Sequence, residues 1–276
     1  MRLGLALPHY DTSYAGRTVS WSAVRDAALL AERAGFDSVW VSDHLFLDWG
    51  KYGGPAEPQG ALECWTTLAG IAGVTDRVRL GSLTLCNDLR NPGLVAKMAA
   101  TLDLLSGGRL DVGMGAGWYE PEFRAAGIPF DPPGPRIRRL GEAVEIIARL
   151  LEGEELTFKG DHYTMDGALC RPLPAQTPRP PIWIGGKGDL LLRTAAAVAD
   201  GWNFSWIGSI DTYAERVAVA DRACERAGRD PSSLHRSVGA FVLAGADDAD
   251  VRRRLARLAE VTPQGVLRGG VSLEEF

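Results

Sequence analysis

An acidic residue beside a histidine is the first feature of this sequence that could do chemistry. Asp43 and His44 follow the apolar, β-branched segment 38–41 and a single serine. Histidine titrates near neutral pH and can pass a proton in either direction, so His44 is a candidate proton relay. The alternative is a histidine that holds a loop through hydrogen bonds, and the residue types alone favour neither role.

Two glycine-rich segments, 113–117 and 185–188, are the next candidates. A glycine loop in front of a helix exposes backbone N–H groups, and the helix dipole favours an anion there. Lys187, one of four lysines in the chain, would add a positive charge to the second loop. We therefore interpret 185–188 as a candidate phosphate site, with a simple turn as the alternative. The first segment is no dinucleotide fingerprint, because Trp118 stands where the third glycine is required.

The other histidines and the cysteines show no metal-ligand spacing. His9, His162 and His235 are isolated in sequence, and we interpret them as structural or solvated residues. The cysteines form no C-x-x-C pair and are predicted to be reduced, buried thiols: Cys64, Cys86, Cys170 and Cys224. We predict no metal site.

Composition excludes several classes of protein. The chain has 276 residues and a net charge of −5, so it lacks the basic character of a nucleic-acid-binding domain. Its apolar runs are far shorter than the roughly 20 residues of a membrane span. The apolar start of the chain meets Pro8 too early for a signal peptide. We expect a cytoplasmic protein with a small-molecule substrate and neither a nucleic-acid nor a membrane partner.

Strands and helices that alternate along the chain must position these residues. The predicted strands are continuous apolar runs, which favours a parallel sheet buried on both faces; they cover 3–7, 38–41, 78–85, 110–115, 182–184, 201–205 and 237–243. Helices are predicted between and after them, over 20–34, 62–74, 92–105, 189–199, 210–227 and 247–259. In parallel α/β folds the chemistry gathers at the carboxyl ends of the strands, where the candidate residues stand.

The alternation is interrupted between 118 and 181, where a helix over 136–151 and a hairpin over 156–165 are predicted. The seven predicted strands fall one short of a closed (β/α)₈ barrel, and the segment 261–276 contains no predicted strand. We interpret residues 1–276 as one barrel domain with an excursion over 118–181. An open doubly wound sheet is the alternative.

Four segments resemble the luciferase-like monooxygenase family, in particular its branch that uses the deazaflavin coenzyme F420. They are AERAGFDSVWVSDHL (31–45), RNPGLVAKMAATLDLLSGGRLDVGMGAGWYEPEF (90–123), GEELTFKGDHY (153–163) and PPIWIGGKG (180–188). They occur in the family's order along nearly the whole chain. The resemblance implies an α/β fold, a (β/α)₈ TIM-like barrel with an excursion between strands four and five.

The resemblance also implies roles for individual residues. Asp43 and His44 match the acid and the histidine near the deazaflavin ring, and Trp49 resembles an indole on the substrate side. Leu83 and Thr84 match a bulge where family members hold a non-prolyl cis peptide against the ring. Five positions match those along the phosphate-bearing tail of the cofactor: Ala116, Gly117, Gly185, Gly186 and Lys187.

Two departures from the family pattern matter. The branch's sugar-phosphate dehydrogenases place a glutamate where Trp118 stands, which argues against that substrate class. The family also has an eighth strand, so strands one and seven would leave an open seam. We expect chain beyond Phe276 to cover this seam with one more helix and strand; a neighbouring subunit or the 261–276 tail is the alternative.

The favoured function is an F420-dependent oxidoreductase that transfers a hydride between the deazaflavin and a small organic substrate, reducing an activated C=C or C=N bond. An FMN-dependent monooxygenase of the same superfamily is the first alternative, and a non-catalytic flavin-binding barrel is the second. Because barrels of this family commonly pair, we expect a homodimer.

Overall fold

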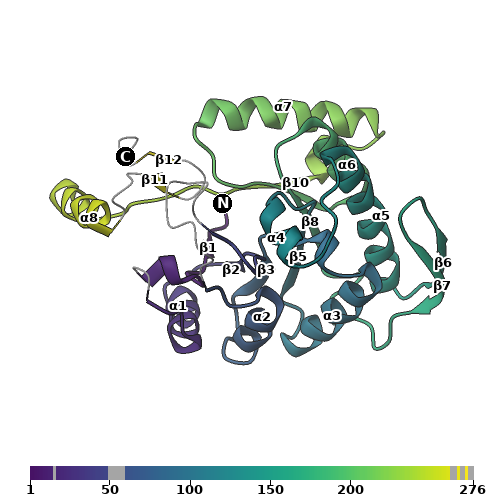
Figure 1. Ribbon diagram of the computed structural model, residues 1–276, viewed down its shortest axis with the longest axis horizontal. Coiled ribbons are helices and arrows are strands. Elements are labelled where there is room, and N and C mark those ends of the chain that lie inside the picture. The colour runs from purple at the N-terminus through teal and green to yellow at the C-terminus, as the bar shows by residue number, and fades with distance from the viewer. Residues whose placement is uncertain (15–16, 49–59, 262–265, 268–270, 273–276) are drawn as a thin grey trace.

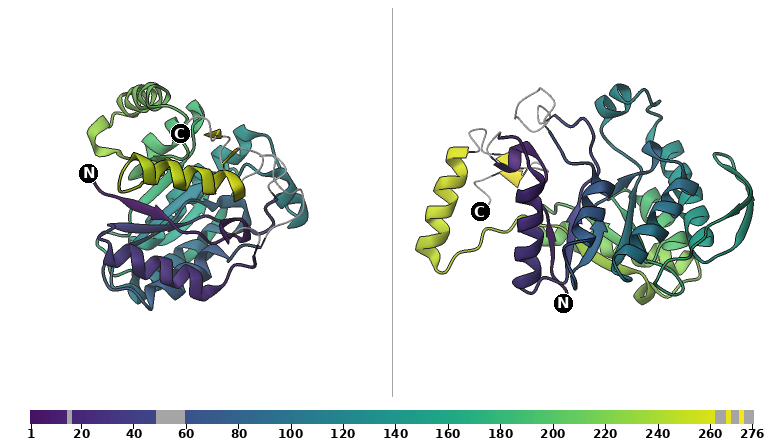
Figure 2. Two further views of the ribbon diagram at one scale, coloured as in Figure 1. Left: turned by 90° about the vertical axis from the view of Figure 1, so that its left-hand side faces the viewer. Right: turned by 90° about the horizontal axis from the view of Figure 1, so that it is seen from below.

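Seven strands form one parallel sheet in the computed structural model, which describes residues 1–14, 17–48, 60–261, 266–267 and 271–272. The sheet has the order β1-β2-β3-β5-β8-β9-β10, and its strands are β1 (Gly4–Ala6), β2 (Ser38–Val41), β3 (Arg79–Ser82), β5 (Leu110–Gly115), β8 (Ile182–Gly185), β9 (Gly201–Phe204) and β10 (His235–Val238). It curls into part of a barrel with helices outside it (Figures 1 and 2). The TIM-like fold is confirmed, and within the described residues no further strand joins β10 to β1 to close the barrel.

The helices between the strands begin within two residues of their predicted starts. They are α1 (Trp21–Arg33), α2 (Cys64–Ala72), α3 (Pro92–Leu105), α6 (Asp189–Val198) and α7 (Ile210–Arg226). Ser20 caps α1 and Asn91 caps α3, each by accepting a backbone N–H, and Pro92 occupies the first turn of α3. Short 3₁₀ turns occur at η1 (Asp11–Tyr14), η3 (Asn87–Leu89) and η4 (Pro231–Ser233).

The centre of the sheet is packed closely enough to require glycine. Every residue of β5 is buried. A Cβ on Gly81 would lie 2.1 Å from the Trp40 indole, and one on Gly113 would lie 1.9 Å from the carbonyl oxygen of Ser82. The Ser82 hydroxyl both donates to the Gly113 carbonyl and accepts from the Gly113 N–H, at 2.9 Å each, so it completes the pairing of β3 with β5.

The predicted third strand is divided in two. It continues beyond β3 as the short β4 (Leu85–Cys86), which pairs with β5, and the peptide bond between Leu83 and Thr84 is cis. The cis peptide that the resemblance implies at this position is therefore present.

The excursion between β5 and β8 contains more structure than its sequence predicts. It comprises α4 (Glu120–Ala125), α5 (Pro133–Leu151) and the antiparallel hairpin of β6 (Glu155–Lys159) and β7 (Thr164–Leu169). The six residues of α4 are too few for periodicity to reveal. The carboxylate of Glu142 on α5 accepts the backbone N–H groups of 161–163 and so fixes the hairpin turn to the helix.

The C-terminal region differs from the prediction in two places. The seventh strand ends at Val238 rather than at residue 243, and Val242 is exposed, so that apolar segment does not enter the core. The prediction of no strand in 261–276 was wrong, because β11 (Val266–Leu267) and β12 (Val271–Ser272) form an antiparallel pair outside the main sheet. The preceding helix α8 (Asp248–Val261) lies at one side of the molecule (Figure 1). Within the described residues, no helix is long and apolar enough to cross a membrane.

We predict that Gly113→Ala destabilises the protein, because the added methyl group meets a backbone oxygen of the neighbouring strand. Overpacking in a core costs typically about 1–3 kcal/mol, and we expect a loss at the upper end of this range or beyond it. Gly208→Ala is the matched control, since nothing lies within 4 Å of its Cβ position. Urea unfolding measures both variants, and equal stability of the two would contradict the described packing of β3 against β5.

Candidate active site

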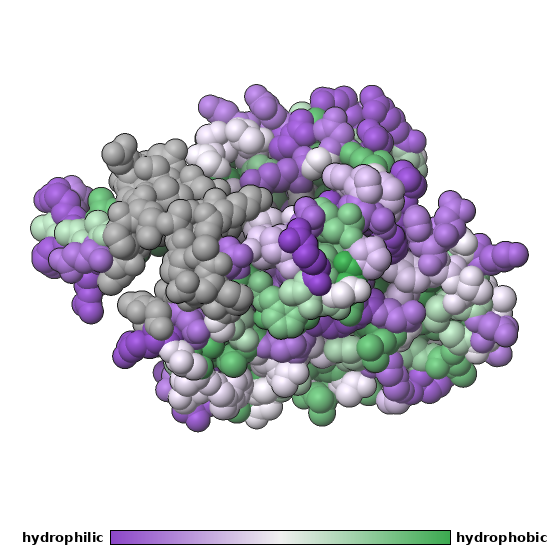
Figure 3. Space-filling view, in the orientation of Figure 1, coloured by the Kyte–Doolittle hydropathy of each residue, from purple (hydrophilic) through white to green (hydrophobic). Residues whose placement is uncertain are grey.

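A cavity of about 650 Å³ lies at the carboxyl ends of the strands. Nine of the ten candidate residues line it: Asp43, His44, Leu83, Thr84, Ala116, Gly117, Gly185, Gly186 and Lys187. The tenth, Trp49, lies outside the described residues. On the face shown in Figure 3, apolar and strongly hydrophilic residues lie side by side near the centre of the molecule. The fold therefore brings the sequence candidates together from four strand ends.

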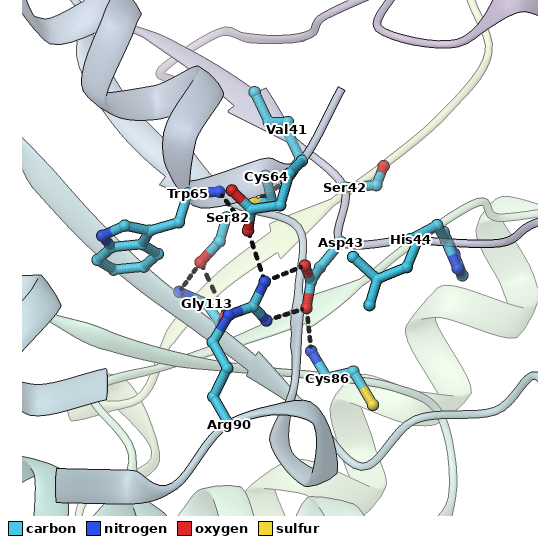
Figure 4. A network of polar contacts seen from close by, with 12 residues as sticks. Val41, Ser42, Asp43, His44, Cys64, Trp65, Ser82, Cys86, Arg90 and Gly113 are labelled. Atoms are coloured by element: carbon cyan, nitrogen blue, oxygen red, sulfur yellow. Dashed lines mark hydrogen bonds and ion pairs between the residues drawn. The ribbon is translucent and has the colours of Figure 1, made fainter. Parts of the chain in front are cut away.

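Asp43 is the centre of a buried polar network (Figure 4). Its carboxylate accepts two hydrogen bonds from Arg90, at 2.7 and 2.9 Å, and one from the backbone N–H of Cys86 at 2.8 Å. Arg90 also donates to Glu63 at 2.6 Å, and Glu63 caps the first turn of α2. Burial opposes the charge of Arg90, but Asp43 and Glu63 outweigh it and raise the pKa of the guanidinium. This geometry makes Asp43 an anchor for the end of β2.

His44 is held by a residue that the sequence analysis missed. Its Nδ1 lies 3.1 Å from Oε2 of Glu122 on α4, and both side chains are buried. The other carboxylate oxygen, Oε1, accepts the backbone N–H groups of Leu45 and Phe46. Burial raises the pKa of the Glu122 carboxyl, but the hydrogen bonds from His44 and from these backbone groups outweigh it, so the net shift is downward.

An ionised Glu122 accepts a hydrogen bond, so Nδ1 of His44 carries the proton of that contact. The hydrogen bonds of the described residues leave Nε2 of His44 without a partner, and His44 lines the cavity. Trp118 lies across the histidine edge-on, with ring centroids 5.6 Å apart. Nε2 is therefore placed to donate a proton to, or accept one from, a molecule in the cavity.

The glycine loops approach the cavity with their backbones. Gly117 and Gly186 have positive φ angles, 71° and 144°, which side chains rarely adopt. A Cβ on Gly117 would lie 2.5 Å from Phe123, and one on Gly185 would lie 2.8 Å from the Thr84 methyl group. A larger residue at these positions would collide with side chains that line the cavity, so glycine lets the backbone lie against them.

Cys86, which lines the cavity, and His9, after the end of β1, are better explained as structural than as reactive residues. Burial raises the pKa of the Cys86 thiol to about 12, so this cysteine stays protonated at neutral pH and is no nucleophile. His9 lies between the carbonyl groups of Leu7 and Ser42, at 3.0 and 3.1 Å, which fits a structural histidine. In the described part of the chain, no group of three or more His, Cys, Asp or Glu residues could hold a metal ion.

We predict that Glu122→Gln lowers the free energy of unfolding by about 1–3 kcal/mol at pH 7, because the buried hydrogen bonds lose their charge. Folding lowers the pKa of this carboxyl, so its contribution is present above the unfolded value of about 4.3 and is lost as pH falls through the folded value. Urea unfolding at pH 7 and below pH 4 should show the difference shrink. Glu120→Gln, on the exposed face of α4, should change stability by less than about 0.5 kcal/mol. An equal loss in both variants would refute the stabilising role of the Glu122 hydrogen bonds.

Comparison with known proteins places the chain in a family. The sequence model of the luciferase-like monooxygenase family matches residues 1–270. An F420-dependent glucose-6-phosphate dehydrogenase of Kineococcus radiotolerans is 35% identical over 215 residues, which cover 77% of this chain and 61% of the relative. Further relatives of that name match to a similar extent, so the chain spans about 60% of the length of these proteins.

Solved structures share the fold. An F420-dependent secondary alcohol dehydrogenase in complex with an F420-acetone adduct is 26% identical with a TM-score of 0.74, over 86% of this chain and 68% of that one. A monooxygenase from Streptomyces bottropensis is 25% identical with a TM-score of 0.75, over 96% of this chain and 78% of that one. Because the family model covers almost the whole sequence, this chain belongs to the luciferase-like monooxygenase family.

Proposed function

We propose that this chain is an oxidoreductase that uses coenzyme F420 and transfers a hydride between the deazaflavin and a small organic substrate. The observation that carries the proposal is the His44–Glu122 pair, which leaves Nε2 of the histidine available at a large cavity. The F420-dependent relatives support the choice of cofactor. The glycine-lined end of the cavity suits a cofactor with an anionic tail, because its described lining includes two cations, Arg136 and Lys187.

The bound deazaflavin would supply or take up the hydride. In the reducing direction, the atom next to the carbon that receives the hydride gains an electron pair and needs a proton. His44 donates this proton from Nε2, and Glu122 stabilises the imidazolium through Nδ1. In the oxidising direction, Nε2 takes the proton from the substrate. Asp43 positions this histidine through the backbone, and Leu83 and Thr84 line the cavity that would hold the deazaflavin.

The charge pattern favours a substrate without a phosphate group. His44 follows β2, whereas Lys187 follows β8, and β3 and β5 lie between them in the sheet. The cation nearest to Asp43 is Arg90, which already pairs with two carboxylates. Trp118 adds an aromatic surface next to His44. An activated C=C or C=N bond stays the preferred substrate class, and a secondary alcohol or ketone is the alternative that the related dehydrogenase supports.

An FMN-dependent monooxygenase is the second candidate, favoured by the related monooxygenase that aligns with 96% of the chain. The non-catalytic flavin-binding barrel is a third. A homodimer and a cytoplasmic location stay predictions of the sequence.

Titration with F420 and with FMN separates these candidates. We expect F420 to bind at micromolar or lower concentration and to quench tryptophan fluorescence, because Trp118 and Trp206 line the cavity. Trp118→Phe should lose part of the quenching, whereas Trp21→Phe on α1 should retain it. Binding of FMN alone would favour the monooxygenase, and binding of neither would contradict both enzyme proposals.

We predict that His44→Ala lowers turnover by roughly 10²–10⁴-fold, the usual contribution of general acid–base catalysis, while cofactor affinity stays nearly unchanged. The absorbance change of the deazaflavin follows turnover, and fluorescence quenching follows binding. His235→Ala is the control, because this histidine is exposed at the start of β10, the last strand of the sheet, whereas His44 follows β2. If His44→Ala turns over substrate like the wild type, the histidine is structural.

A further inference from the structure

Arg136, near the start of α5, is a buried cation whose described partners are all neutral. Its side chain donates from Nε to the carbonyl of Asp131 at 2.7 Å, and from Nη1 to the carbonyls of Ala116, at 3.0 Å, and Gly117. Only 6% of the residue is exposed. The carboxylate of Asp131 pairs with Arg139 instead, so Arg136 has no carboxylate partner among the described residues.

One edge of this guanidinium is left for another molecule. A guanidinium has five N–H donors, of which Nε provides one and Nη1 two. The remaining nitrogen, Nη2, donates to no described residue. It is also not fully buried, so another molecule can reach it. Arg136 lines the 650 Å³ cavity, and we infer that the accessible edge of Nη2 faces it.

The surroundings of this edge favour an anion. Lys187, which lines the same cavity from the β8 loop, contacts the carbonyl of Trp206 at 3.2 Å and the face of Phe204, which are also neutral groups. Helices α5 and α6 both begin beside the cavity, at Pro133 and after the 185–188 loop, so their dipoles add positive potential there. A buried charge without a counterion is unfavourable, and an anionic ligand would relieve this.

We propose that Arg136 binds the cofactor's phosphate group through Nη2, with Lys187 as a second cation. This inference rests on the proposed function, but it holds for F420 and FMN alike because both carry a phosphate. The same guanidinium also engages the Ala116 and Gly117 carbonyl oxygens, which would otherwise repel the anion. The excursion helix α5 thereby contributes a binding residue to a site otherwise built by strand ends.

The test compares a phosphate-bearing cofactor with its phosphate-free analogue. Arg136→Met should bind F420, or FMN if that is the wild type's cofactor, about 10- to 100-fold more weakly, as expected for the loss of a charge-assisted hydrogen bond. Its affinity for deazariboflavin or riboflavin should change by less than about threefold, well below that loss. Arg138→Met, exposed on the same helix, is the matched control and should bind both ligands like the wild type.

Two results would overturn the proposal: unchanged affinity for the phosphate-bearing cofactor, or an equal loss for both ligands, which would mean that Arg136 only supports the loop. If Arg136→Met fails to fold, Arg136→Lys replaces it in the test. The lysine keeps the charge, so this variant should bind the cofactor with an affinity between that of the wild type and that expected of the methionine variant. Inorganic phosphate provides a readout without cofactor. It should raise the melting temperature of the wild type more than that of Arg136→Met at equal ionic strength, and equal shifts would count against the proposal. If the wild type binds neither F420 nor FMN, the proposed function is refuted, and the phosphate measurement still tests Arg136.

Discussion

The buried ion pair between Asp43 and Arg90 is the interaction on which the site depends. The Asp43 carboxylate joins the end of β2 to the start of η3 through Cys86 N–H, and Arg90 extends the contact to Glu63 at the start of α2. A charge buried this deeply is stable only with its partner, and removal of one member leaves the other uncompensated. Because His44 is the next residue in the chain, its backbone position follows from this network.

Charge is distributed unevenly around the cavity, and this asymmetry orients whatever binds there. The β2 side holds carboxylates that are already satisfied, by Arg90 at Asp43 and by His44 at Glu122. The β8 side presents Lys187, with Arg136 nearby on α5, and both contact carbonyl oxygens. Under the proposed function, the anionic end of the cofactor would lie by Arg136 and Lys187, and its uncharged end would be left to His44.

Local signals in the sequence were sufficient for the strands and helix starts that carry the site. Ser20 and the pair Asn91–Pro92 mark helix starts through contacts within a few residues, and the glycine loops stand where backbones approach closely. Glu122 could not be found in this way, because its partner His44 lies 78 residues earlier. Its helix, α4, is too short for periodicity. The end of β10 was misjudged because Val242 is exposed and Phe241 stacks on Trp206 instead of entering the core.

The excursion between β5 and β8 completes the site from outside the sheet. Trp118 begins it, α4 supplies the partner of His44, and α5 supplies Arg136. The strand ends provide only the anchored histidine and the glycine backbones, which any flavin-like ligand could use. Under the proposed function, a change in the excursion would alter proton transfer, tail binding and the aromatic surface while the buried strands keep their packing. Substrate choice would then depend on the inserted helices more than on the barrel strands.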